Sequence, residues 1–374
     1  IFLNYGKIKL YLQCFYVNDD VYIMDNLQTI NTTGRVLLIY TGGTIGMGIN
    51  RQTNALEPLD FNHLVSNLPE MKYLSTNVDV YQFENPIDSS DMAPEVWTRL
   101  VGIIANRYQA YDGFVVLHGT DTMAYTASAL SFMLENLTKP VILTGSQLPI
   151  GHLRTDAKEN LISSIDLASA KHEDGTPIVP EVCIYFNGRL LRGNRTTKQN
   201  ADGFNAFDSF NYPHLCEVGI RFQFSSHHIL KPNYTKPMVP HYDLNPNIMV
   251  LSLFPGIQAN IFEHALDAPE LKGVVMRSFG SGNAPQQAWL IETLKKASQR
   301  GVSIVNISQC VTGFVEMGRY DTGYQLKGTG VISGQDCTVE AAVTKLMYLY
   351  GRYGDDKKTI RELLSIPLAG EFQI

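Results

Sequence analysis

The sequence predicts an α/β protein with a larger N-terminal parallel-sheet domain and a smaller C-terminal α/β domain. From residue 35 onward, short apolar runs alternate with segments whose apolar residues recur at helical spacing. Most of these runs end in glycine or a small polar residue, and a proline-rich stretch divides the alternation into two sets. Strands that alternate with helices favour a parallel sheet covered on both faces, and this pattern decides the predicted fold class.

The first set of apolar runs predicts the strands of the larger domain. RVLLIY at 35–40 is followed by GFVVLHG, KPVILTG and EVCIYFNG, which end at residues 119, 145 and 188. Apolar residues at helical spacing predict helices at 94–108 and 123–136. Because ligands of such sheets bind outside the carboxyl ends of the strands, we expect functional residues in the glycine-rich segments after each run.

The second set predicts the smaller domain, with strands in NIMVLSLFPG, GVVMRSFGSG and GVSIVNISQ between residues 247 and 309. The stretch before it carries four prolines within 225–247 and has no clear period, which is typical of a linker. We therefore expect a catalytic α/β domain at 34–225, a linker at 226–245 and a C-terminal α/β domain at 246–374. Residues 1–33 are interpreted as an N-terminal extension without a catalytic role, and whether residues 1–23 are native stays open.

The composition argues against several classes of protein. Lys and Arg total 30 and Asp and Glu total 36, a net charge of −6 without a basic run, so nucleic acid is not an expected partner. No apolar stretch reaches the length of a transmembrane helix, so we expect no membrane association. The five cysteines form no CxxC pair, which indicates neither a zinc ribbon nor a disulfide framework and favours a reducing cytoplasm.

Three predicted strands of the larger domain end in glycine followed by hydroxyl residues. These ends read TGGT at 41–44, HGTDT at 118–122 and TGSQ at 144–147. Any one of them is typical of a helix N-cap, where a Ser or Thr oxygen accepts a backbone N–H. Three together, one of them containing Asp121, favour a shared site at one edge of the sheet.

A fourth segment, NGRLLRGNRTTKQNADGF at 187–204, is interpreted as a polar, glycine-punctuated loop that contains Lys198. It is either a solvated surface loop or the source of a catalytic base. A threonine hydroxyl is a weak nucleophile until a base removes its proton, and a desolvated lysine can act as that base. Asp121 could orient the lysine, as a third group orients the base in a serine triad.

Other catalytic motifs do not fit. GGTIGMG follows a predicted strand but does not match GxGxxG, so a dinucleotide site is not predicted. GxxxxGK[ST], HExxH and GxSxG are also missing from the sequence, and we expect no metal site.

Four motifs together resemble the bacterial-type L-asparaginases, and in their wording the cytoplasmic (type I) branch. They are TGGTI at 41–45, HGTDTMAYTASAL at 118–130, TGSQLP at 144–149 and GNRTTK at 193–198. Their order and spacing match over about residues 34–370. The resemblance implies hydrolysis of the asparagine side-chain amide to aspartate and ammonia through a threonine-bound acyl-enzyme, without a cofactor.

The resemblance also implies roles for single residues. Thr44 would be the nucleophile, and its place at the glycine turn would let nearby amides stabilise the oxyanion. Thr120, Asp121 and Lys198 would form a second hydroxyl–carboxylate–amine group.

The substrate-binding residues follow in the same way. The residues implied are Gly43, Asp88, Ser89, Ser146 and Asn283. Asp88 and Ser89 would hold the α-amino and α-carboxylate groups, and Ser146 would contact the amide through its backbone. Asn283 would reach from the C-terminal domain of one subunit into the site of its neighbour, which implies a homodimer or a dimer of dimers.

The sequence departs from the family pattern in the loop after TGGTI. The family has a tyrosine there, and the matching place falls near Leu56. The activation of Thr44 therefore stays open.

Cooperative dependence on asparagine, which some cytoplasmic members show, needs a site besides the catalytic one. Thr197, Arg277 and Cys310 are candidates for it. Their alternative interpretation is structural, with Arg277 in an ion pair and Cys310 packed as a small apolar residue.

Two alternative functions stay open at this point. A glutaminase-asparaginase or an ammonia-releasing amidotransferase subunit of the same fold would act on glutamine, which is one methylene longer and differs by only ~1–3 kcal/mol in binding. A catalytically silent amino-acid sensor is the alternative from another class, and the presence of Asp121 and Lys198 weighs against it.

Overall fold

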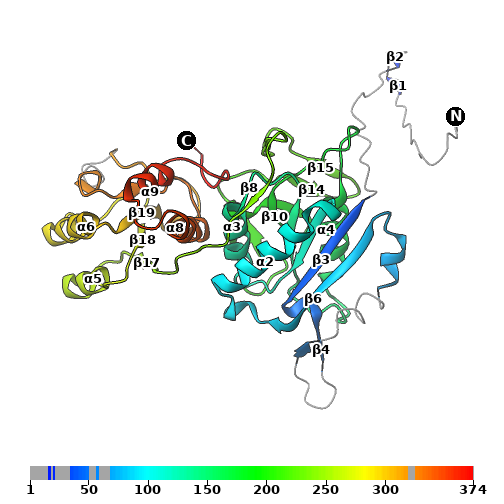
Figure 1. The fold of residues 1–374 in the computed structure, drawn as a ribbon, viewed down its shortest axis with the longest axis horizontal. Helices are drawn as coiled ribbons and strands as arrows, with labels where there is room; N and C mark the ends of the chain where they lie inside the picture. Colours follow the sequence, from blue (N-terminus) through cyan, green and yellow to red (C-terminus); the bar gives the residue numbers. More distant parts are fainter. Residues whose placement is uncertain are drawn as a thin grey trace.

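The structure, a computed structural model, describes residues 34–49, 56–58, 68–318 and 325–373, together with the paired strands β1 (Tyr16–Val17) and β2 (Asp20–Val21). Two groups of elements lie next to each other, each built on its own sheet (Figure 1). The larger is coloured blue to green and the smaller yellow to red in Figure 1. The predicted fold class, a larger and a smaller α/β unit, is confirmed.

The larger sheet has eight strands in the order β15-β14-β11-β10-β9-β7-β3-β6. Along the chain these are β3 (Arg35–Gly42), β6 (Asn77–Ile87), β7 (Gly113–Leu117), β9 (Val141–Thr144), β10 (Val182–Phe186), β11 (Arg189–Arg192), β14 (Cys216–Val218) and β15 (Phe222–Phe224). From β6 to β10 neighbouring strands are parallel, and from β10 to β15 they are antiparallel. The sheet is therefore mixed, where the sequence predicted only parallel strands.

The antiparallel part begins at a hairpin that the sequence analysis assigned to a loop. Asn187 and Gly188 both have positive φ angles, 50° and 77°. Asn-Gly favours this two-residue turn because both residues tolerate the left-handed region. The turn folds β11 back onto β10, so residues 189–192 form a strand of the larger sheet, and residues 199–204 remain as loop.

Helices cover both faces of the parallel part, which explains why its inner strands β3, β7, β9 and β10 are largely apolar and buried. In β3, Leu37 and Ile39 face the side of α2 and α3, while Val36 and Leu38 face the side of α4. The helices are α2 (Pro94–Arg107), α3 (Met123–Met133) and α4 (Ala157–Ser169). Together these layers hold the strand ends in fixed positions.

The chain then crosses to the smaller sheet through the proline-rich stretch. Within it, β16 (Val239–Pro240) pairs with β8 (Leu134–Glu135), which follows α3. The smaller sheet is parallel throughout and contains β17 (Ile248–Ser252), β18 (Gly273–Ser278), β19 (Ser303–Ser308) and β20 (Ile332–Ser333). Its helices are α5 (Ala259–Leu266), α6 (Ala288–Arg300), α8 (Val339–Tyr353) and α9 (Lys357–Leu364).

Helix α8 joins the two units. It packs against α3 of the larger unit and against β17 and β18 of the smaller one (Figure 1). One hydrophobic cluster accordingly runs from Ile39 and Leu130 through Leu346 to Val275. The two sheets thus share part of one core.

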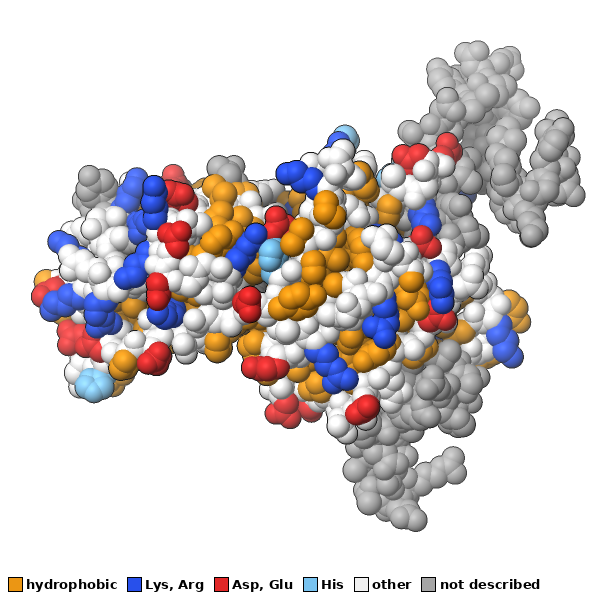
Figure 2. All heavy atoms as spheres, in the orientation of Figure 1, with side chains coloured by type: hydrophobic (Ala, Val, Ile, Leu, Met, Phe, Trp, Pro, Cys, Tyr) orange, Lys and Arg blue, Asp and Glu red, His pale blue; other side chains and the backbone are white. Residues whose placement is uncertain are grey.

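Charged side chains of both signs are interspersed on the smaller unit in the view of Figure 2, where α5 and α6 lie. In the described part of the chain, no helix is long and apolar enough to cross a bilayer.

Two further short pairings lie near the carboxyl edge of the larger sheet. They are β4 (Met47–Ile49) with β5 (Leu56–Pro58) and β12 (Thr197–Lys198) with β13 (Phe207–Asp208). Strand register aligns the ends of the central strands, since Tyr40 pairs with Leu117 and Leu117 with Thr144. The segments that follow these strands therefore emerge at one edge.

Candidate active site

Glycines allow the turn that carries Thr44 to lie directly against its neighbours. A Cβ atom at Gly42 would lie 2.1 Å from the carbonyl oxygen of Ile87, and one at Gly43 would lie 2.5 Å from the amide nitrogen of Gly119. Gly43 also has φ +91°, a conformation that side chains rarely permit. Thr44 begins a short 3₁₀ turn immediately afterwards and is half-buried.

The next two strand ends approach each other in the same way. A Cβ atom at Gly119 would lie 2.5 Å from the hydroxyl oxygen of Ser89, and one at Gly145 would lie 2.4 Å from the carbonyl oxygen of His118. The segments after β3, β6, β7 and β9 are consequently in contact along one edge of the sheet.

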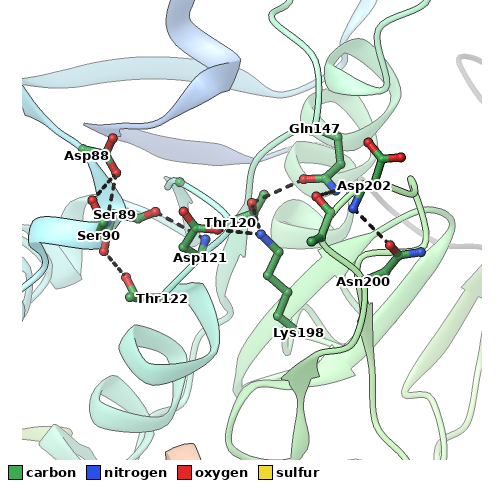
Figure 3. A network of polar contacts seen from close by, with 12 residues as sticks. Asp88, Ser89, Ser90, Thr120, Asp121, Thr122, Gln147, Lys198, Asn200 and Asp202 are labelled. Carbon is green, nitrogen blue, oxygen red and sulfur yellow. Dashed lines mark hydrogen bonds and ion pairs between the residues drawn. The ribbon is translucent and has the colours of Figure 1, made fainter.

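A lysine, a threonine and a carboxylate meet at this edge. Lys198 Nζ lies 2.7 Å from Asp121 Oδ1 and 2.8 Å from Thr120 Oγ1 (Figure 3). The Lys198 side chain is 18% exposed and that of Asp121 is 63% exposed, so the amine reaches the cluster from the buried side. The structure thus brings together the three residues that sequence analysis grouped.

Gln147 joins this cluster, a contact that sequence analysis missed. Its Oε1 accepts a hydrogen bond of 3.3 Å from Thr120 Oγ1, and its Nε2 donates one of 3.0 Å to the carbonyl of Gly203. Gln147 therefore ties Thr120 to the loop that follows Lys198. The position of Gln147 directly after Thr-Gly-Ser is the sequence feature from which this contact could have been predicted.

Asp88 and Ser89 lie at the end of β6, beside the same segments (Figure 3). Asp88 is exposed, and the backbone and side-chain hydrogen bonds that it accepts from Ser90 lower its pKa. Ser89 is buried, and it accepts hydrogen bonds from Asp121 N–H at its hydroxyl and from Thr122 at its carbonyl. An ionised carboxylate is thus presented to solvent next to Asp121.

Comparison with known proteins decides the family. Residues 35–230 match the family model described as asparaginase, N-terminal, and residues 247–364 match that of the glutaminase/asparaginase C-terminal domain. L-asparaginase 1 of Escherichia coli strain K12 is 45% identical over 352 residues, which cover 90% of this chain and 97% of that protein. The chain belongs to the asparaginase family.

Solved structures of asparaginases agree. The structure of L-asparaginase I from Vibrio cholerae has a TM-score of 0.82 at 39% identity, covering 91% of this chain and all of that one. A probable cytoplasmic L-asparaginase from Campylobacter jejuni has a TM-score of 0.71 at 25% identity, covering 88% and 98%. The resemblance to the type I branch of the asparaginases is confirmed.

The remaining residues that the sequence predicted for the site of this asparaginase lie as follows. Ser146 is buried, and its hydroxyl donates to the carbonyl of Leu148. Asn283 lies after β18 in the smaller unit, where its backbone exchanges two hydrogen bonds with Phe279. The backbone of Leu56 belongs to β5, but its side chain lies outside the described residues, as does most of the loop where the family tyrosine was expected.

The three residues proposed for regulation line one cavity of about 90 Å³. Thr197 donates a hydrogen bond of 2.6 Å to Oε1 of Glu340, a residue that sequence analysis missed. Glu340 is buried, and this burial raises its pKa. Among the described residues, Glu340 Oε2 and Arg277 Nε have no hydrogen-bond partner. Cys310 is exposed at the cavity instead of being packed.

The cavity and the lysine cluster share the two-residue strand β12. Successive side chains of a strand point to opposite faces. Thr197 accordingly contacts Glu340 while Lys198 contacts Asp121.

Metal-binding residues are not gathered into a site: in the described ranges, no group of three or more His, Cys, Asp or Glu residues could hold an ion.

Proposed function

We propose that the chain hydrolyses the side-chain amide of L-asparagine to L-aspartate and ammonia, with Thr44 as the nucleophile. The observation that carries the proposal is the contact of Lys198 Nζ with both Thr120 and Asp121 on the loop that touches the Thr44 turn. The names of the asparaginases to which the chain is similar support the substrate.

The reaction has two halves. The Thr44 hydroxyl oxygen attacks the amide carbon as its proton is removed, and the carbonyl electrons move onto the oxygen. These electrons return as the C–N bond breaks, and the amide nitrogen takes up the proton that Thr44 lost and leaves as ammonia. Water then attacks the threonine ester, aspartate is released, and a water proton returns to the Thr44 oxygen. Lys198 Nζ donates a hydrogen bond to Thr120 Oγ1 and would take up the Thr120 proton during turnover, while Asp121 would orient the amine and balance its charge.

Binding of the substrate follows from the charges at the edge. The exposed Asp88 carboxylate suits an α-ammonium group, and Ser89 sits beside it for the α-carboxylate. Gly43 and Ser146 would approach the amide through their backbones. Glutamine hydrolysis and transamidation are not favoured by the matches, and a silent sensor would not need the lysine cluster.

The remaining proposals concern the whole protein. We assign a catalytic domain to 34–225, a linker to 226–245 and a C-terminal domain to 246–374, because the larger sheet ends at β15 and the smaller begins at β17. A cytoplasmic location is supported by the description of the Campylobacter jejuni relative as probably cytoplasmic.

Loss of the proton-transferring group should slow turnover without unfolding the protein. We expect Lys198→Met, Asp121→Asn and Thr120→Val each to lower kcat for ammonia release from asparagine by about 10² or more, because each interrupts general-base catalysis. Thr44→Ala should abolish turnover. Lys171→Met is the matched control, since this lysine is equally buried (19% exposed) and pairs with Asp112 away from the cluster. Wild-type kcat in Lys198→Met would contradict the assigned group.

We also propose that the active site is shared between subunits of a closed homo-oligomer built from two-fold dimers. Asn283 lies in the smaller unit, whereas the lysine cluster lies at the edge of the larger sheet. An asparagine amide can donate to a carboxylate, so a neighbouring subunit could complete the pocket with this side chain.

Mixing two inactive variants tests the shared site. Thr44→Ala and Asn283→Ala proteins are dissociated together and reassembled, and ammonia release is measured. In a mixed dimer one pocket contains both intact residues, so activity should return in part. Each variant reassembled alone is the control and should stay inactive. Hybrid dimers without recovered activity would show that each pocket is built from one chain.

We further propose that the cavity beside Thr197 binds asparagine and regulates the enzyme. Glu340 Oε2 could accept from an α-ammonium group, and Arg277 could pair with an α-carboxylate. Because Thr197 and Lys198 form one short strand, a ligand that moves Thr197 changes the position of Lys198.

Rate curves test this regulation. The wild-type rate should depend sigmoidally on asparagine concentration, and Arg277→Gln should make the curve hyperbolic because the carboxylate partner is lost. Arg221→Gln, at an exposed site outside the cavity, should leave the curve unchanged. A hyperbolic wild-type curve, or a sigmoidal curve in Arg277→Gln, would contradict the proposal.

A further inference from the structure

A buried chain of hydrogen bonds ends one residue before Thr120. The indole N–H of Trp97, in α2, donates to Thr126 Oγ1 at 2.9 Å. Thr126, in α3, lies 2.8 Å from His118 Nε2, and His118 Nδ1 lies 2.7 Å from the carbonyl oxygen of Gly119. His118 and Thr126 are fully buried, and neither touches Lys198 or Asp121 in the contacts above.

The donors and acceptors of this chain can be assigned from chemistry. A carbonyl oxygen only accepts, so His118 Nδ1 carries a hydrogen and donates to Gly119. An indole N–H only donates, so the single hydroxyl hydrogen of Thr126 remains for His118 Nε2. Both ends therefore require the same neutral Nδ1–H tautomer. Burial lowers the pKa of His118 to about 4, which keeps the ring neutral near pH 7.

Gly119, whose carbonyl accepts the hydrogen bond from His118, has a backbone that another residue must hold in one conformation. Gly119 cannot be replaced by a larger residue without contact at 2.5 Å with Ser89 Oγ. Glycine, however, leaves the backbone free to rotate, and here that freedom precedes Thr120 directly. In a trans peptide the C=O and the N–H point in opposite directions. Holding the Gly119 carbonyl toward His118 therefore turns the Thr120 N–H away from the core.

We infer that His118, held by Thr126 and Trp97, is a positioning residue that fixes the Gly119–Thr120 peptide and so aligns Thr120 and Asp121 with Lys198. This inference rests on the proposed amidohydrolase function. The chain of hydrogen bonds links α2 and α3 to the strand end, so these bonds, rather than the apolar packing of the helices, set the geometry of the cluster.

Substitution of Thr126 separates positioning from packing. Thr126→Val keeps the shape but removes both hydrogen bonds, and kcat should fall by about 10-fold or more because misplaced catalytic groups lose rate steeply. KM should change less than kcat, because Asp88, which is proposed to bind the α-ammonium group of the substrate, is not part of this chain of hydrogen bonds. Thr126→Ser keeps the hydroxyl and should restore the wild-type kcat. Leu130→Ala, a buried apolar change in the same helix, should lower the melting temperature and leave kcat unchanged.

Nitrogen NMR of the histidine rings gives a second readout that does not depend on activity. The signals of His118, assigned by their loss in His118→Gln, should show the neutral Nδ1–H tautomer at every pH from about 6 to 8. An Nε2–H tautomer, a titration in that range, or unchanged kcat in Thr126→Val would overturn the inference. A wild-type protein that shows the tautomer but releases no ammonia from asparagine would contradict the proposed function instead.

Discussion

The close approach of four strand ends is the constraint on which the rest of the site depends. The aligned register of β3, β7 and β9 places the three following segments at one edge of the sheet. These segments can touch because Gly43, Gly119 and Gly145 have no Cβ atom. Each of these contacts is with backbone or with a short side chain, so it leaves no room for adjustment. The hydroxyls of Thr44 and Thr120 consequently take their positions from the sheet.

Lys198 reaches the same edge from a different direction, and contacts with residues 336 and 369–371 hold the segment that precedes it. The segment just before it is fixed by Arg195, which pairs with Asp336 at 2.6 Å and donates to the carbonyl of Glu371. Asn194 donates to the carbonyl of Ala369. Buried ion pairs are weak contributors to net stability but costly to break, so this arrangement favours one position of the loop. The smaller unit thereby sets the geometry of the lysine cluster as well as lining the cavity at Thr197.

Local sequence patterns predicted most strands and the motifs of the candidate site, but they missed one hairpin and one long-range contact. Apolar runs and the glycines that follow them predicted the strands and the motifs that contain Thr44, Thr120 and Lys198, because hydrophobic periodicity and turn preferences depend only on residues close in sequence. The turn at Asn187 was readable in the same way but was assigned to a loop. The contact between Thr197 and Glu340 was not readable, because it joins segments 143 residues apart and depends on how α8 packs.

Replacing Gly119 by alanine shows whether the close packing of the strand ends assembles the proposed catalytic group. Ammonia release from asparagine is measured for folded Gly119→Ala beside Gly151→Ala, where an added Cβ meets nothing within 4 Å. We expect kcat to fall by about 10² or more in Gly119→Ala, since the methyl group displaces Ser89 or Thr120, and to stay at the wild-type level in Gly151→Ala. Full turnover in Gly119→Ala would contradict this expectation.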